Sequence, residues 1–204
     1  MTVIRRGFRG PLAAGLCAAT LLIPVRARAA GIIKNPDEHP HYTAEIEPHV
    51  LFGNDNYFNS GFGVGARVSF PVMDPGFIKG INDTVAISAG LDLFFLNDCY
   101  YRNETNCSAT NFTVPVVLQW NFYVAPHISV FGEPGIALQF YNFDNCPAGI
   151  RCDEPSRTHF VPFVLYGGMR YHFNDKIAIT PRLGFDNYGA FYLSFGVSFF
   201  AGGG

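Results

Sequence analysis

Apolar and polar side chains alternate with a period of two residues along most of the chain beyond residue 41. Within residues 83–95, Val85, Ile87 and Leu91 fall on one face, and smaller or more polar residues occupy the positions between them. The same period recurs over residues 42–52, 61–70, 111–124, 128–141, 159–173, 177–186 and 190–200. A two-residue period is typical of β-strands whose two faces meet different surroundings. The pattern therefore predicts eight strands and an all-β fold.

The connections between these segments alternate between long and short. The long, polar connections span residues 53–60, 97–111 and 144–158. The links near residues 125–127 and 174–175 are short. Such alternation is typical of an up-and-down outer-membrane barrel, which has long outer loops and short periplasmic turns. The link at residues 71–83 is longer than the other links on its side, and a short helix within it is one possibility.

The less apolar face of the segments is built largely from small side chains. They are Gly61, Gly63, Gly65, Ser69, Ser88, Gly90, Ser129, Gly135, Ala137, Gly168, Thr180, Gly184, Ser194 and Gly196. Small side chains suit the narrow interior of an eight-stranded barrel, and a closed barrel leaves no unpaired sheet edge in hydrocarbon. The sequence thus predicts a closed antiparallel eight-stranded transmembrane β-barrel over residues 41–200, with its apolar face in lipid.

Five prolines lie inside the predicted strands: Pro48, Pro115, Pro134, Pro162 and Pro181. Each lacks the backbone N–H that a strand donates to its neighbour. We therefore expect some of these strands to bulge or to end early.

The N-terminus has the layout of a secretory signal peptide over residues 1–29. Arg5, Arg6 and Arg9 precede an apolar stretch, and Ala27-Arg28-Ala29 forms a cleavage site. The paired arginines also leave a twin-arginine route open. Cleavage would remove five arginines and leave an acidic chain, which argues against a nucleic-acid partner. Residues 30–40 are then expected to form a periplasmic segment, and residues 201–204 a short tail.

Four stretches resemble the OmpA-type eight-stranded outer-membrane β-barrels. They are VPVVLQWNF (114–122), VFGEPGIAL (130–138), YGGMRYHF (166–173) and YLSFGVSFF (192–200). The resemblance covers residues 41–200 and implies a location in the bacterial outer membrane. It departs from the family in that no peptidoglycan-binding domain is expected to follow the barrel.

Four cysteines follow the signal peptide, in two close pairs that lie in the long loops. Four cysteines permit three connectivities, and proximity favours Cys99–Cys107 and Cys146–Cys152. An oxidising periplasm supports disulfides. A metal site is the alternative, but the spacing is not a zinc pattern, and no cofactor is expected.

Charged residues are predicted to face the barrel interior in seven positions. They are Glu45, Glu47, Arg67, Asp92, Glu133, Arg170 and Arg182. Enclosed charges must pair or stay hydrated, so these residues are expected to form a network. The network is either a salt-bridged plug or part of a gated ion or proton path. The narrow bore of eight strands favours the plug.

The sequence offers little support for an enzyme. His127 lies near Ser129, and His159 follows Thr158, but neither pair has a carboxylate placed by spacing to complete an acyl-hydrolase triad. A lipid-modifying barrel enzyme is therefore a secondary hypothesis. Another is a secreted lipocalin-like barrel, with its apolar face turned inward around a ligand.

The leading interpretation is a small non-enzymatic outer-membrane barrel with a role in envelope integrity or surface interaction. Outer-membrane lipid is the expected partner, and the loops at 97–111 and 144–158 are the expected contacts for a surface ligand or protein. The first loop carries Tyr100, Tyr101 and Arg102, residue types that are enriched at binding hot spots. We expect the barrel to be a monomer.

Overall fold

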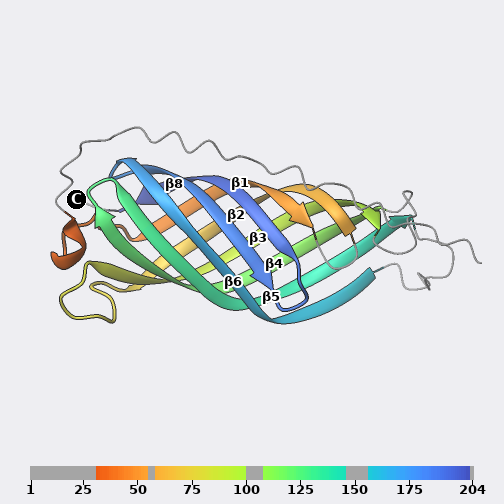
Figure 1. Cartoon of the computed structure of the whole chain (residues 1–204), viewed down its shortest axis with the longest axis horizontal. Helices are drawn as coiled ribbons and strands as arrows, with labels where there is room; N and C mark the ends of the chain where they lie inside the picture. Colours follow the sequence, from red (N-terminus) through yellow and green to blue (C-terminus); the bar gives the residue numbers. More distant parts are fainter. Residues whose placement is uncertain (1–30, 55–57, 100–107, 146–155, 203–204) are drawn as a thin grey trace, which may run out of the picture.

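The structure is a computed structural model that describes residues 31–54, 58–99, 108–145 and 156–202. The strands are β1 (Ala44–Asn54), β2 (Phe58–Met73), β3 (Asp83–Cys99), β4 (Ser108–Ala125), β5 (Ile128–Asn145), β6 (Ser156–Asn174), β7 (Ile177–Asp186) and β8 (Phe191–Ala201). Each is antiparallel to the next, and β8 pairs with β1 to close the barrel. The predicted closed, antiparallel eight-stranded β-barrel is therefore confirmed (Figure 1). The predicted signal peptide lies outside the described residues.

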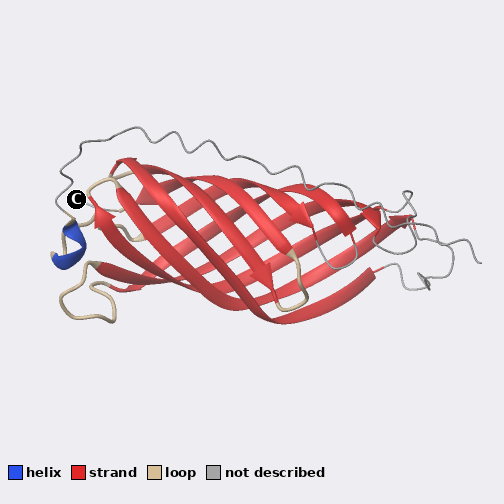
Figure 2. Ribbon diagram, viewed as in Figure 1, coloured by secondary structure: helices blue, strands red, loops and turns tan. Residues whose placement is uncertain are grey.

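The links between β4 and β5, between β6 and β7 and between β2 and β3 lie at one end of the barrel, as do both described chain ends (Figure 2). A single-turn 3-10 helix, η1 (Ile32–Lys34), lies there, close to β4. The segment around it is tied to the link between β2 and β3, because Asn82 donates its backbone N–H to the carbonyl oxygen of Ile33 at 2.8 Å. In the described residues, no helix is long and apolar enough to cross a membrane.

The strands extend further toward the long loops than the sequence pattern predicted. β3 continues to Cys99 and β4 begins at Ser108, while β5 ends at Asn145 and β6 begins at Ser156. The ends of the predicted loops at 97–111 and 144–158 are therefore strand. The 19 residues of β6 far exceed the roughly 9–11 that cross a bilayer. These extensions were predicted to be loop because their residues are polar.

The link between β2 and β3 contains no helix over its described residues 74–82. β2 instead continues to Met73, and irregular turns lead back to β3 at Asp83. The short helix that was considered for this link is therefore not formed. The link folds back against the N-terminal segment.

Of the five prolines inside the predicted strands, Pro162 alone coincides with a register shift; Pro71, in the extension of β2, lies beside another. Val161 pairs with Ala137 and Val164 with Gly135, so β6 carries one extra residue between these pairs. The other four prolines lie within strands whose register is unchanged at that position. An antiparallel strand directs each backbone N–H toward only one neighbour, and a proline therefore interrupts only one side of the ladder.

The two faces of the wall are oriented as predicted. Phe62 is 55% exposed, Leu91 54% and Phe195 51%, all on the outside. Ser88 and Gln119, on the inside, are fully buried. A lipocalin-like barrel requires the reverse arrangement, with its apolar side chains around an internal ligand. The exposed apolar wall is the surface that lipid would cover.

Candidate functional site

The barrel interior holds all seven charged residues that the sequence placed there. They are Glu45 and Glu47 on β1, Arg67 on β2, Asp92 on β3, Glu133 on β5, Arg170 on β6 and Arg182 on β7. None is more than 7% exposed. We call these seven residues, together with their hydrogen-bonding neighbours, the lumen network.

Arg170 binds Glu45 in a bidentate pair. Its Nε donates to Glu45 Oε1 at 3.0 Å, and one terminal nitrogen donates to Oε2 at 3.0 Å. The other terminal nitrogen donates to Asn121 Oδ1 at 2.6 Å. Fork-to-fork pairing of this kind satisfies both charges and fixes their orientation. Three strands, β1, β4 and β6, are joined by this one guanidinium group.

Arg182 connects two carboxylates. Its terminal nitrogens donate to Glu47 Oε1 at 2.6 Å and Oε2 at 2.8 Å, and its Nε lies 3.0 Å from Glu133 Oε2. Glu133 also accepts from Gln119 Nε2 at 2.7 Å and from Arg67 at 3.2 Å. A buried carboxylate with several donors is compensated for much of the hydration it lost.

His49 is a further member of the network, and it was not among the residues predicted to belong to it. Its Nε2 lies 2.8 Å from Asp92 Oδ1, and its side chain is fully buried. Three guanidinium groups face four carboxylates in the network, and His49 contacts one of these carboxylates. The inward position of His49 could be inferred from the sequence, because residues two apart in a strand share a face and Glu45 and Glu47 point inward.

Aromatic rings cover the guanidinium groups. The centre of the Arg170 guanidinium lies 4.4 Å from the Phe131 ring centroid, and that of Arg182 lies 5.2 Å from the same ring. Arg67 lies 4.3 Å over the ring of Tyr166. Cation–π contacts stabilise cations that have lost water. Sequence analysis did not identify these two rings as part of the network.

Toward the long loops, the interior becomes apolar. Leu51, Phe94, Leu96, Ala109 and Tyr141 form a buried cluster, which we call the apolar layer. Between this layer and the network, a cavity of about 20 Å³ borders Leu51 and Asp92. Such a cavity has room for about one water molecule. Paired charges and packed side chains thus fill the described interior.

A serine and a histidine meet inside the barrel, but not in a complete triad. Ser129 Oγ lies 3.0 Å from His172 Nε2. His172 Nδ1 has no hydrogen-bond partner among the described residues. The place of an orienting carboxylate is therefore not filled by any described side chain. The pairs considered from sequence, His127 with Ser129 and His159 with Thr158, do not form such a site either.

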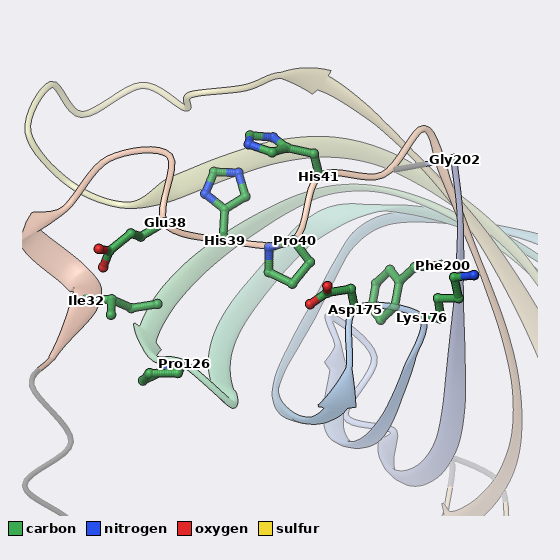
Figure 3. A pocket seen from close by; sticks show the side chains of 10 residues that line it. All are labelled: Ile32, Glu38, His39, Pro40, His41, Pro126, Asp175, Lys176, Phe200 and Gly202. Atoms are coloured by element: carbon green, nitrogen blue, oxygen red, sulfur yellow. The ribbon is translucent and has the colours of Figure 1, made fainter. Parts of the chain in front are cut away.

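At the other end of the barrel, a pocket of about 690 Å³ opens beside the N-terminal segment. Figure 3 shows His39 and His41 on one wall, with Lys176 and Phe200 across the opening. Burial raises the pKa of the nearby Tyr42 phenol well above its ordinary value, so this group is uncharged at neutral pH. Sequence analysis identified no function for this region.

The predicted loop site lies largely outside the described residues. Cys99 is the last residue of β3, whereas Cys107, Cys146 and Cys152 lie outside the described residues. Tyr100, Tyr101 and Arg102 lie outside them as well. Both disulfides and the loop contacts therefore stay predictions.

The chain matches no family model, and no curated protein sequence matches it significantly. Among solved structures, it is similar to the outer membrane protein OprG from Pseudomonas aeruginosa, with a TM-score of 0.56 and 10% identity over 80% of this chain and 98% of OprG. It also matches Neisserial surface protein A, with a TM-score of 0.48 and 11% identity over 77% of this chain and 96% of that protein. A third match is Ail of Yersinia pestis in complex with the heparin analogue sucrose octasulfate, with a TM-score of 0.48 and 8% identity over 77% of this chain and 96% of Ail.

At such low identities the likeness bears on fold alone, and OprG is the most informative of the three. The agreement extends over nearly the whole of OprG and over the barrel of this chain. It confirms the resemblance proposed from the sequence. The chain has the fold of the small eight-stranded outer-membrane β-barrels.

Proposed function

We propose that the protein is a small, non-enzymatic and non-conducting barrel of the bacterial outer membrane that holds interaction loops at the cell surface. The observation that supports this proposal most strongly is the filled interior. The lumen network takes side chains from all eight strands, including Gln119 on β4 and Ser198 on β8. An interior closed in this way leaves the lipid-facing wall and the loops as the working surfaces.

Conductance tests the closed interior directly. The refolded wild-type barrel should give no unitary currents in a planar lipid bilayer, because paired charges and the apolar layer block the bore. A porin of 16–18 strands, which encloses an aqueous channel, is the positive control. Reproducible unitary currents from the wild type would show that the network lines a path rather than a plug.

Outer-membrane lipid is the proposed partner of the wall, and the barrel is proposed to act as a monomer. The exposed apolar side chains and the signal-peptide layout of residues 1–29 support export to that membrane. The mature protein should sediment with outer membranes and should migrate faster on a denaturing gel when it is not boiled. Recovery from the periplasm without detergent would contradict this location.

The proposed interaction sites are the loops within residues 97–111 and 144–158. We infer disulfides Cys99–Cys107 and Cys146–Cys152, which would restrain the loops. Tyr100, Tyr101 and Arg102 are the proposed contact residues, since a Tyr-Tyr-Arg sequence combines aromatic area with a charged donor.

A loop variant separates binding from folding. Producing cells should be retained on surfaces coated with protein or with sulfated polysaccharide, and alanine at Tyr100, Tyr101 and Arg102 should abolish that retention. The gel shift should not change. Alanine at Asn103, Glu104 and Thr105, in the same loop, is the matched control and should keep retention. Equal retention by the Tyr-Tyr-Arg variant would show that this loop does not carry the interaction.

A further inference from the structure

Three side chains with metal-binding atoms meet beside the pocket at the N-terminal end of the barrel. His39 and His41 lie on the segment before β1, and Asp74 lies just after β2. One nitrogen of each histidine and one Asp74 oxygen all lie within 4.8 Å of one another. His39 Nε2 is 3.0 Å from Asp74 Oδ1, and His41 Nδ1 is 2.9 Å from Asp74 Oδ2.

The hydrogen bonds of Asn82 determine which nitrogen of His39 is free. The Asn82 amide nitrogen donates to the Glu38 carbonyl at 2.9 Å, so the amide oxygen faces the ring. That oxygen lies 2.5 Å from His39 Nδ1, which must therefore carry the proton. In the neutral ring, His39 Nε2 then has a lone pair, and this lone pair points toward a carboxylate oxygen.

Two lone pairs facing each other at 3.0 Å need a cation to join them. The cation is either a proton on His39 or a metal ion that both atoms bind. An Nδ1–H donating to an amide oxygen is the arrangement that orients metal-binding histidines, because the second bond fixes the tautomer and the ring. The His39 ring is held further by stacking on Tyr123, with centroids 4.5 Å apart and planes 12° apart.

The distances suit a small divalent ion. Ligand atoms on a tetrahedral zinc ion, at about 2.0–2.1 Å from the metal, lie about 3.4 Å from one another. The cluster needs only small side-chain movements to reach this spacing. The His41 side chain is 57% exposed and that of Asp74 28%, so an ion can enter from the pocket and keep a water ligand.

We propose that His39, His41 and Asp74 bind a divalent transition-metal ion, with Asn82 as the residue that positions His39. Two imidazoles and one carboxylate favour Zn²⁺ and similar ions over Mg²⁺ or Ca²⁺, which prefer oxygen ligands. The ion would join the N-terminal segment to the link between β2 and β3. The site is independent of the loops and of the lumen network.

Titration of the refolded mature chain, without a histidine tag, with ZnCl₂ in a calorimeter tests the proposal. The wild type should bind one ion per chain at about pH 7.5, and binding should weaken in acid, because protons compete with the metal ion for its ligands. His41→Ala and Asp74→Asn should each weaken binding by about tenfold or more. His41 is exposed, so His41→Ala should keep the gel shift that reports folding.

His127→Ala is the matched control, because His127 lies in the turn between β4 and β5 at the same end of the barrel. It should bind zinc as the wild type does. Asn82→Ala should weaken binding by about 10–100-fold if Asn82 positions His39. No saturable binding by the wild type, or wild-type affinity in both His41→Ala and Asp74→Asn, would overturn the proposal. An equal loss in His127→Ala would do the same.

Discussion

The outer and inner faces of the barrel wall are built from the same strands, but different requirements select their residues. On the outer face, Leu91 and Phe195 have half of their surface exposed, and any apolar side chain satisfies lipid there. On the inner face, Arg182 is held by Glu47 and Glu133 on two other strands. The outside is therefore specified by the class of residue, and the inside by the identity of each partner.

The largest effect should follow loss of one charge from the inside. Arg182→Met removes the guanidinium group that binds Glu47, and it leaves Glu133 with Arg67 and Gln119 as donors. Breaking a buried pair costs about 3–5 kcal/mol. The free energy of unfolding, measured in urea with lipid vesicles, should fall by that amount. The single tryptophan of the chain, Trp120, provides the fluorescence signal. A variant as stable as the wild type would show that the inner charges are hydrated.

A charge placed on the outside should have the next largest effect. Leu91→Arg or Leu118→Arg puts a cation against lipid, which costs about 2–4 kcal/mol near the bilayer midplane. The loss should depend on bilayer thickness. Ser88→Arg, on the inside, should destabilise the barrel because the arginine side chain does not fit in the packed interior. This loss of stability should depend little on bilayer thickness. Tolerance of arginine at both outer positions would mean that this face does not meet lipid.

Replacing an inner pair as a unit should have a smaller effect than removing one partner. Glu45→Leu combined with Arg170→Met removes both charges, which is often close to neutral. Asn121 Oδ1 loses its donor from Arg170, so we expect a loss of about 1–2 kcal/mol. Arg170→Met alone should be clearly less stable than the double variant. If the double variant were less stable than Arg170→Met in the same urea titration, the inner residues would not be specified by their partners.

The smallest effect should come from exchanging one apolar residue for another on the outside. Leu91→Ile keeps the class of residue, and the free energy of unfolding should stay within about 0.5 kcal/mol of the wild type. The matched inner exchange is Gln119→Glu, which keeps the shape but replaces the donor to Glu133. It should be markedly less stable than Leu91→Ile. Equal stabilities would remove the contrast between the faces.

The sequence predicted the barrel and its inward charges because strand parity is a local property. Residues two apart share a face, so Glu45 and Glu47 could be placed inside without knowledge of any other strand. His49 follows the same parity and could have been included. The pairing of Arg170 with Glu45 could not be predicted, because it depends on how distant strands come together across the lumen.

The cluster of His39, His41 and Asp74 was beyond sequence reasoning for a related reason. No periodicity connects the N-terminal segment with the link after β2, and the two meet only because the link folds back toward η1. Strand length was underestimated because polar composition was taken to indicate loops. Beyond the bilayer, both faces of a strand can be polar, as the exposed Asn97 and Asn142 illustrate.

The lumen network also has a consequence for the order of assembly. Glu45 and Glu47 belong to the first strand, and their partners Arg170 and Arg182 belong to β6 and β7. A chain that has inserted only its early strands holds two carboxylates without their guanidinium groups. Closure of β8 on β1 brings the ends of the sheet together and completes both pairs at once. Charges that are paired in the finished barrel are unpaired in an open one and disfavour it, so we expect the last step of assembly to be cooperative.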